Sequence, residues 1–118
     1  DKVNHPTFRN WYEPGNTYSY SKGKLDPFDD APTVSDLVVG VCIKDFLPPQ
    51  NVMVTPGTGQ VDFPSVLARL VAGGFTQGPL VVECVNAEGD LKQTINQARQ
   101  ARLYLERVCA GLNSESGQ

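Results

Sequence analysis

The stretch VVGVCIKDFL, Val38 to Leu47, decides how the rest of this 118-residue chain is interpreted. A continuous run of apolar and small residues is typical of a strand that is covered on both faces. We therefore predict a buried strand from Val38 to Phe46. The run ends on two adjacent opposite charges, Lys44 and Asp45, and Cys42 lies two residues before the lysine. A buried strand that ends in this way is expected to deliver polar side chains to a site.

Upstream of this strand, the sequence predicts one short strand and a long loop. Phe8–Glu13 is rich in aromatic residues and is followed by Pro14-Gly15-Asn16, a pattern typical of a strand and then a turn. The segment 17–36 is expected to be a loop with no more than one helical turn, around residues 27–31. No firm helix is predicted there.

Downstream of the strand, the pattern predicts a helix, a strand and a second helix. Asp62 is expected to begin a helix that has Pro64 in its first turn and ends at Gly73. The segment 78–85, GPLVVECV, predicts another buried strand. Asp90 is placed to cap the last helix, whose apolar residues recur every three or four positions, and Gly111 is expected to close it.

Composition and charge narrow the class of protein. The length suits one domain, and contents of 40% hydrophobic and 19% charged residues are those of an ordinary soluble globular protein. The net charge of -3 supplies no basic field for a nucleic acid. No apolar run approaches the roughly 20 residues of a membrane span. Three cysteines, an odd number without metal-like spacing, predict reduced thiols and a cytoplasmic location.

Strands that alternate with helices predict right-handed crossovers and a parallel sheet. Three parallel strands leave two open edges, so we expect them to be part of a larger sheet. In such folds the chemistry collects at the carboxyl ends of the strands. Each predicted strand ends near a polar candidate: Glu13, then Lys44 with Asp45, then Glu83.

Glu83 is the sharpest of these candidates, because a carboxylate in a buried strand is costly unless it is paired or bound to a cation. The residues alone leave two interpretations open for it: a salt bridge to a neighbour such as Lys44, or a metal ligand or general base. Glu13 precedes a Pro-Gly turn and could simply face solvent. His5, near the start of the chain, is given no role.

The run VCIKD, followed by GTGQVDFPSVLARLVAGGFTQGPLVVE, resembles the closing part of the xylose isomerase-like TIM-barrel superfamily of sugar phosphate isomerases and epimerases. That family has a strand ending in His-x-Lys-Asp, a Gly-x-Gly before a hydrophobic-Asp-Phe, a helix, a Gly-aromatic segment and a strand ending in a metal-binding glutamate. The earlier YEPGN resembles the acidic turn of the family. The matching residues are Lys44-Asp45, Gly57, Gly59, Val61-Asp62-Phe63, Gly74-Phe75, Gly78 and Glu83.

The resemblance implies an α/β fold that is a partial TIM barrel, with about three parallel strands and two clear helices from the C-terminal portion of an eight-stranded barrel. A whole barrel takes about 250 residues. We expect residues 1–112 to form this part of the barrel and residues 113–118 to be a flexible tail. The other strands would lie in a removed N-terminal half or on another chain, and a second copy could cover the open edges by self-association.

The resemblance also implies a divalent metal ion held by Glu13, Glu83 and the residue at position 42. The family has histidine at that position, where this chain has Cys42, and it has aspartate where this chain has Glu13. Oxygen ligands suit manganese or magnesium, whereas a thiolate shifts the preference toward zinc. The alternative is that Cys42 is a small buried side chain in a site that has lost its metal.

The implied reaction is proton transfer at the carbon beside a sugar carbonyl, through an enediolate. Glu83 and an upstream carboxylate would remove and return the proton, and Lys44 would hold a substrate oxygen. Asn16, Asp45 and Trp11 are the other expected substrate contacts. The expected partner is a small sugar, with neither a nucleic acid nor a membrane, and the expected enzyme is an isomerase or epimerase when its barrel is complete.

Two other functions stay open. A non-catalytic relative or fragment, suggested by the two changed ligand positions, would hold no metal and would associate with itself. An AP endonuclease of the same superfamily would need an Asp-x-His pair ahead of Gly57, where this chain has Asn51 and Met53. The acidic balance of the chain also argues against a DNA partner.

Overall fold

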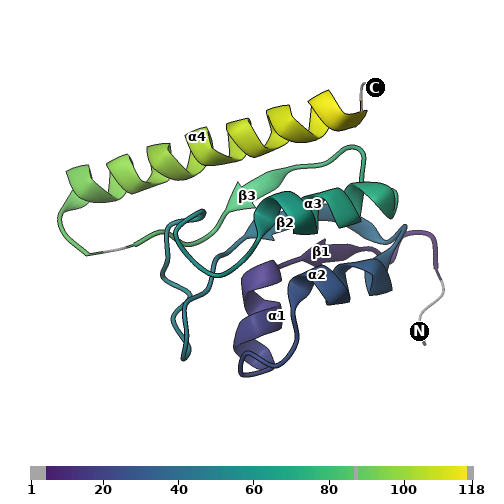
Figure 1. The fold of residues 1–118 in the computed structure, drawn as a ribbon, viewed down its shortest axis with the longest axis horizontal. Helices are drawn as coiled ribbons and strands as arrows, with labels where there is room; N and C mark the ends of the chain where they lie inside the picture. Colours follow the sequence, from purple (N-terminus) through teal and green to yellow (C-terminus); the bar gives the residue numbers. More distant parts are fainter. Residues whose placement is uncertain (1–4, 87, 117–118) are drawn as a thin grey trace.

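A computed structural model describes residues 5–86 and 88–116 of the chain. Three strands form one parallel sheet in the order β1 (Asn10–Tyr12), β2 (Val38–Ile43) and β3 (Leu80–Val82). The three arrows in Figure 1 point the same way, so the carboxyl ends of the strands meet at one edge of the molecule. The predicted parallel α/β architecture is therefore present.

Helices follow each strand and lie side by side across the sheet. Figure 1 shows α2, α3 and α4 in the same order as the strands, and α1 below the end of β1. The helical elements are α1 (Pro14–Tyr20), α2 (Pro27–Asp30), the 3-10 helix η1 (Ala31–Val34), α3 (Phe63–Ala72) and α4 (Leu91–Ser116). No helix within residues 5–86 and 88–116 has the length and apolar character that crossing a membrane requires.

The core lies between the sheet and the helices. Tyr12, Val41 and Ile43 on the strands are buried together with Phe63 and Val66 of α3. The opposite face of the sheet has no such cover in the described part of the chain, because Trp11 is 49% exposed and Val81 is 45% exposed. The sheet is thus apolar on both faces but packed on only one.

Two helix starts agree with the sequence prediction. The Asp62 carboxylate accepts a hydrogen bond from the backbone N–H of Ser65 and caps α3, which ends at Gly73. Asp90 accepts from the N–H of Gln93, and the Gln93 side chain accepts from the N–H of Asp90 in return. This reciprocal pair is a capping box, which satisfies donors at the start of α4 that have no partner within the helix.

Helix α1 was not predicted, since Pro14-Gly15-Asn16 was interpreted as a turn. Proline is equally suited to the first turn of a helix, where its missing N–H costs nothing. A Cβ on Gly15 would overlap the backbone carbonyl of Lys44, so only glycine allows α1 to pack this closely on the end of β2. Tertiary contact, not local propensity, decides this helix.

The prediction that Gly111 ends the last helix is wrong, because α4 continues to Ser116. Leu112, one residue beyond the glycine, packs against the hydrophobic core, which rewards continued helix. The division of the chain after residue 112 stays a prediction, and residues 117 and 118 lie outside the described part. The strands are also shorter than predicted, since they end where Lys44 and Glu83 leave the ladder.

The loop between β2 and α3 is held by one buried carboxylate. Asp45 is 0% exposed, and one of its oxygens accepts from the N–H of Phe46 at 2.8 Å and of Val61 at 3.0 Å. The other oxygen accepts from the N–H of Gly57 at 3.0 Å and of Gly59 at 2.9 Å. Four backbone donors therefore stabilise the anion without any cation.

We predict that Asp45→Asn destabilises the protein by about 3 kcal/mol, because an amide offers one acceptor oxygen and turns its NH2 group toward two of the four donors. Urea unfolding at neutral pH measures the loss. Asp29→Asn is the matched control, since Asp29 is exposed. A loss at position 45 no larger than that of the control would contradict the assigned role.

Candidate functional site

The structure brings Glu13, Cys42 and Glu83 together at the carboxyl ends of the three strands. Glu13 directly follows β1, Cys42 is the second-last residue of β2, and Glu83 directly follows β3. Because parallel neighbouring strands end at the same edge, residues far apart in sequence converge there. The two carboxylates and the sulfur each offer a ligand atom, and these atoms all lie within 4.8 Å of one another.

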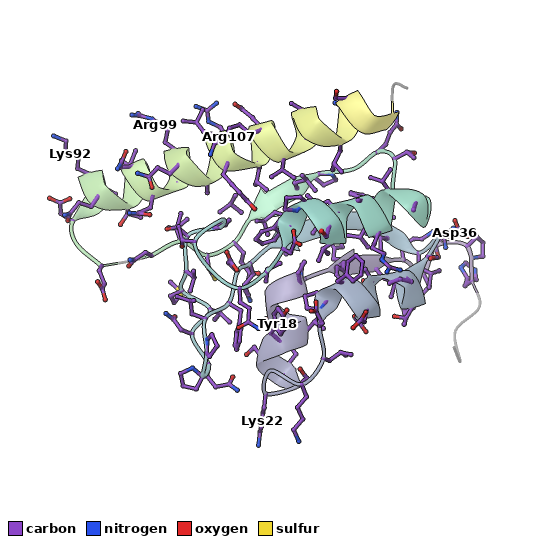
Figure 2. The ribbon with its side chains drawn as sticks, in the orientation of Figure 1. Tyr18, Lys22, Asp36, Lys92, Arg99 and Arg107 are labelled. Atoms are coloured by element: carbon purple, nitrogen blue, oxygen red, sulfur yellow. The ribbon has the colours of Figure 1, made fainter. Side chains whose placement is uncertain are left out.

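Lys44 lies between the two carboxylates. Its ammonium nitrogen is 3.3 Å from a Glu13 oxygen and 3.2 Å from a Glu83 oxygen. It also donates a hydrogen bond to the Asn16 side-chain oxygen at 3.2 Å, while the Asn16 amide donates to Glu13. The lysine is nearly buried, at 9% exposure. Lys22, Lys92 and Arg99, in contrast, extend away from the body of the molecule (Figure 2).

These charges shift the pKa values of their neighbours. Burial works to lower the pKa of Lys44, but the hydrogen bonds and charges of Glu83 and Glu13 outweigh it and raise that pKa above its ordinary value. Burial raises the pKa of the Cys42 thiol, the charges of Glu13 and Glu83 raise it further, and the Lys44 charge offsets a part. At neutral pH the site therefore contains an ammonium and a neutral thiol.

The remaining predicted residues lie in different places. Asn16 joins the cluster through α1, as described. Trp11 lies on the Cys42 side of the sheet with its ring against Gly40, one pleat below Glu13. Asp45 points away from the cluster into its loop, where both oxygens are occupied, so the structure contradicts its predicted substrate contact. His5 is exposed and bonds to Thr7 instead of the site.

The donor set fits a divalent cation. Ligand atoms at about 2.0–2.3 Å from a common ion lie within roughly 4.6 Å of one another, close to the 4.8 Å limit found here. Glu13 and Glu83 would supply oxygen and Cys42 would supply sulfur. Sequence analysis had selected these three positions, but it left open whether Lys44 pairs with Glu83, and the geometry shows that it pairs with both carboxylates.

Parallel strands, helices packed on one face and a polar cluster at the strand ends define a partial (β/α) barrel. The sequence matches no protein-family model and no curated protein. Among solved structures, it is similar to a xylose isomerase domain protein from Alicyclobacillus acidocaldarius, with TM-score 0.68 and 22% identity over 92% of this chain and 39% of that chain. The corresponding protein from Planctomyces limnophilus has TM-score 0.68 and 23% identity over 96% of this chain and 40% of that chain.

The chain therefore has a partial xylose isomerase-like TIM-barrel fold, as the resemblance predicted. It spans about two fifths of the length of these two solved proteins. That these are the closing strands of the barrel stays a prediction.

We predict that Lys44→Met lowers the free energy of unfolding by about 2 kcal/mol at neutral pH, between the values for exposed and buried ion pairs, because 44% of the Glu83 side chain is exposed. A raised lysine pKa stabilises the fold fully below the ordinary value of 10.5, and the stabilisation is lost as pH rises through the raised pKa. The difference between variant and wild type should therefore shrink only in that alkaline range.

Chemical unfolding across neutral and alkaline pH measures this difference. Lys24→Met, a change at an exposed lysine, is the control and should follow the wild type at every pH. A Lys44→Met protein as stable as the wild type at neutral pH would mean that the two ion pairs contribute nothing.

Proposed function

We propose that this chain forms part of the active site of a divalent-metal-dependent sugar or sugar phosphate isomerase or epimerase. The observation that carries the proposal is the convergence of Glu13, Cys42, Glu83 and Lys44 on the carboxyl ends of three adjacent parallel strands. The similarity to xylose isomerase domain proteins supports it, since barrels of this kind place their chemistry at that end.

The chemistry is proton transfer at a carbon beside a carbonyl, through an enediolate. A divalent ion held by Glu13, Cys42 and Glu83 would polarise the oxygens of the substrate. Glu83 is the group suited to take and return the proton, because it is the more exposed of the two carboxylates and can reach a ligand. Lys44 would hold a substrate oxygen, and Asn16 orients both Glu13 and Lys44 through its hydrogen bonds.

Solvent exchange tests this chemistry without knowledge of the sugar. The purified chain is incubated in D2O with a panel of aldoses, ketoses and their phosphates, and with Mn²⁺, Mg²⁺ or Zn²⁺ in turn. NMR then detects deuterium at the carbon next to the carbonyl. We expect exchange that Glu83→Gln abolishes and that Glu88→Gln, at an exposed glutamate beyond β3, preserves. Metal binding without any exchange would contradict the catalytic role.

A second candidate function is that of a non-catalytic barrel relative. The specific observation in its favour is that Lys44 already neutralises both carboxylates, which are then held as an internal ion-pair network. In this case Glu13 and Glu83 stabilise the strand ends and bind no metal. Metal binding by the purified chain separates the two candidates, since only the first requires it.

We also propose that the uncovered sheet face is completed by further barrel strands, on a second copy or in a longer polypeptide. The support is the open edges of β1 and β3 together with the exposed Trp11 and Val81. Trp11 is the single tryptophan, so its fluorescence reports on this face alone.

If the chain associates with itself, raising its concentration should increase the native mass and shift Trp11 emission to shorter wavelength. Light scattering and fluorescence of the same samples measure both effects. Val81→Lys places a charge on the face and should keep the chain monomeric. Constant mass and constant emission across the concentration range would contradict self-association.

A further inference from the structure

Sulfur is the unusual donor in the cluster of Glu13, Cys42 and Glu83. Cys42 lies in β2 and pairs in register with Val81 of β3, so its side chain lies on the sheet face that also carries Glu83. It is partly buried and forms no disulfide. Two carboxylates and one thiol give three protein ligands, the number with which zinc forms catalytic sites that keep one position open.

The Lys44 ammonium bears on which ion this cluster would take. It lies 3.3 Å from Glu13 and 3.2 Å from Glu83, so the charge of the carboxylates is already partly neutralised. An ion that binds through charge alone gains less here than at an unpaired carboxylate pair. Magnesium, in particular, requires oxygen ligands and loses its water reluctantly. A metal–sulfur bond is the contribution that Lys44 does not weaken directly.

We propose that Cys42 makes this site selective for a thiophilic divalent ion, zinc or its spectroscopic substitute cobalt, over magnesium and manganese. The inference rests on the proposed function, because it assigns the ion of the same site. Binding forms a metal–sulfur bond, and the thiol proton passes to the solvent. Soft thiolate ligands select zinc over magnesium and manganese, which prefer carboxylate, carbonyl and water oxygens.

Cobalt titration of the purified chain tests this selectivity. Thiolate coordination produces a sulfur-to-cobalt charge-transfer band in the near ultraviolet, which carboxylates do not. We expect the band in the wild type, its removal by Zn²⁺, and its persistence in excess Mg²⁺ or Mn²⁺. Cys84→Ser and Cys109→Ser should keep the band, which assigns the sulfur to Cys42.

Two variants at position 42 make the test specific. Cys42→Ser should lose the band and bind Zn²⁺ at least about tenfold more weakly, the lower end of what losing even a neighbour of a ligand costs. Cys42→His replaces sulfur with nitrogen, so it should also lose the band while still binding cobalt, and its preference should shift toward Mn²⁺. Circular dichroism establishes that each variant is folded.

Cobalt bound without the band, an unchanged Zn²⁺ affinity in Cys42→Ser, or tighter binding of Mn²⁺ than of Zn²⁺ would each overturn the inference. If Mn²⁺ still binds in these cases and Glu13→Gln removes it, the proposed metal site survives without its sulfur ligand. If the wild type binds none of the four ions, the inference and the metal-dependent function fall together. The two failures are therefore distinguishable.

Discussion

The buried carboxylate of Asp45 is the interaction on which the rest of the structure depends. An anion removed from water is costly unless hydrogen-bond donors surround it, and here four backbone N–H groups do so. They fix the loop 57–61 against the end of β2. That loop leads directly to the cap of α3 at Asp62, and Gly57 within it lies against the Tyr104 ring of α4. One side chain thus ties the central strand to the two helices that follow it.

Lys44 and Asp45 are adjacent in sequence, yet they serve opposite sides of the strand. Asp45 turns into its loop, and Lys44 turns to the strand ends, where Glu13 and Glu83 receive it. The two charges therefore do not neutralise each other. Each is satisfied by separate partners, so the loop keeps its anion and the strand ends keep their cation. The end of β2 can then vary its site chemistry without losing the loop that supports it.

Sequence reasoning succeeded where the signal is local or follows from strand direction. The caps at Asp62 and Asp90 depend on partners three residues away, and the convergence of Glu13 and Glu83 follows from parallel order. It failed where a distant contact decides the outcome. The start of α1 depends on how closely Gly15 approaches the Lys44 carbonyl, which no spacing in the sequence reveals.

The role of Asp45 was missed for a related reason. A carboxylate next to a lysine at a strand end looks the same in sequence whether it faces a ligand or a loop. Only the path of the chain through residues 57–61 brings the four donors to it. The course of α4 past Gly111 likewise depends on the packing of Leu112, since glycine is tolerated in a helix when a later residue is buried.

The bridge from Glu13 through Lys44 to Glu83 also constrains how this chain can diverge over evolutionary time. Losing one glutamate leaves the lysine with a single partner, and losing both leaves a nearly buried cation uncompensated. Losing the lysine first leaves two carboxylates facing each other. Neutral drift through these single steps is therefore slow, and lineages that alter the site are expected to change these three positions together, as a covarying set carried by three separate strands.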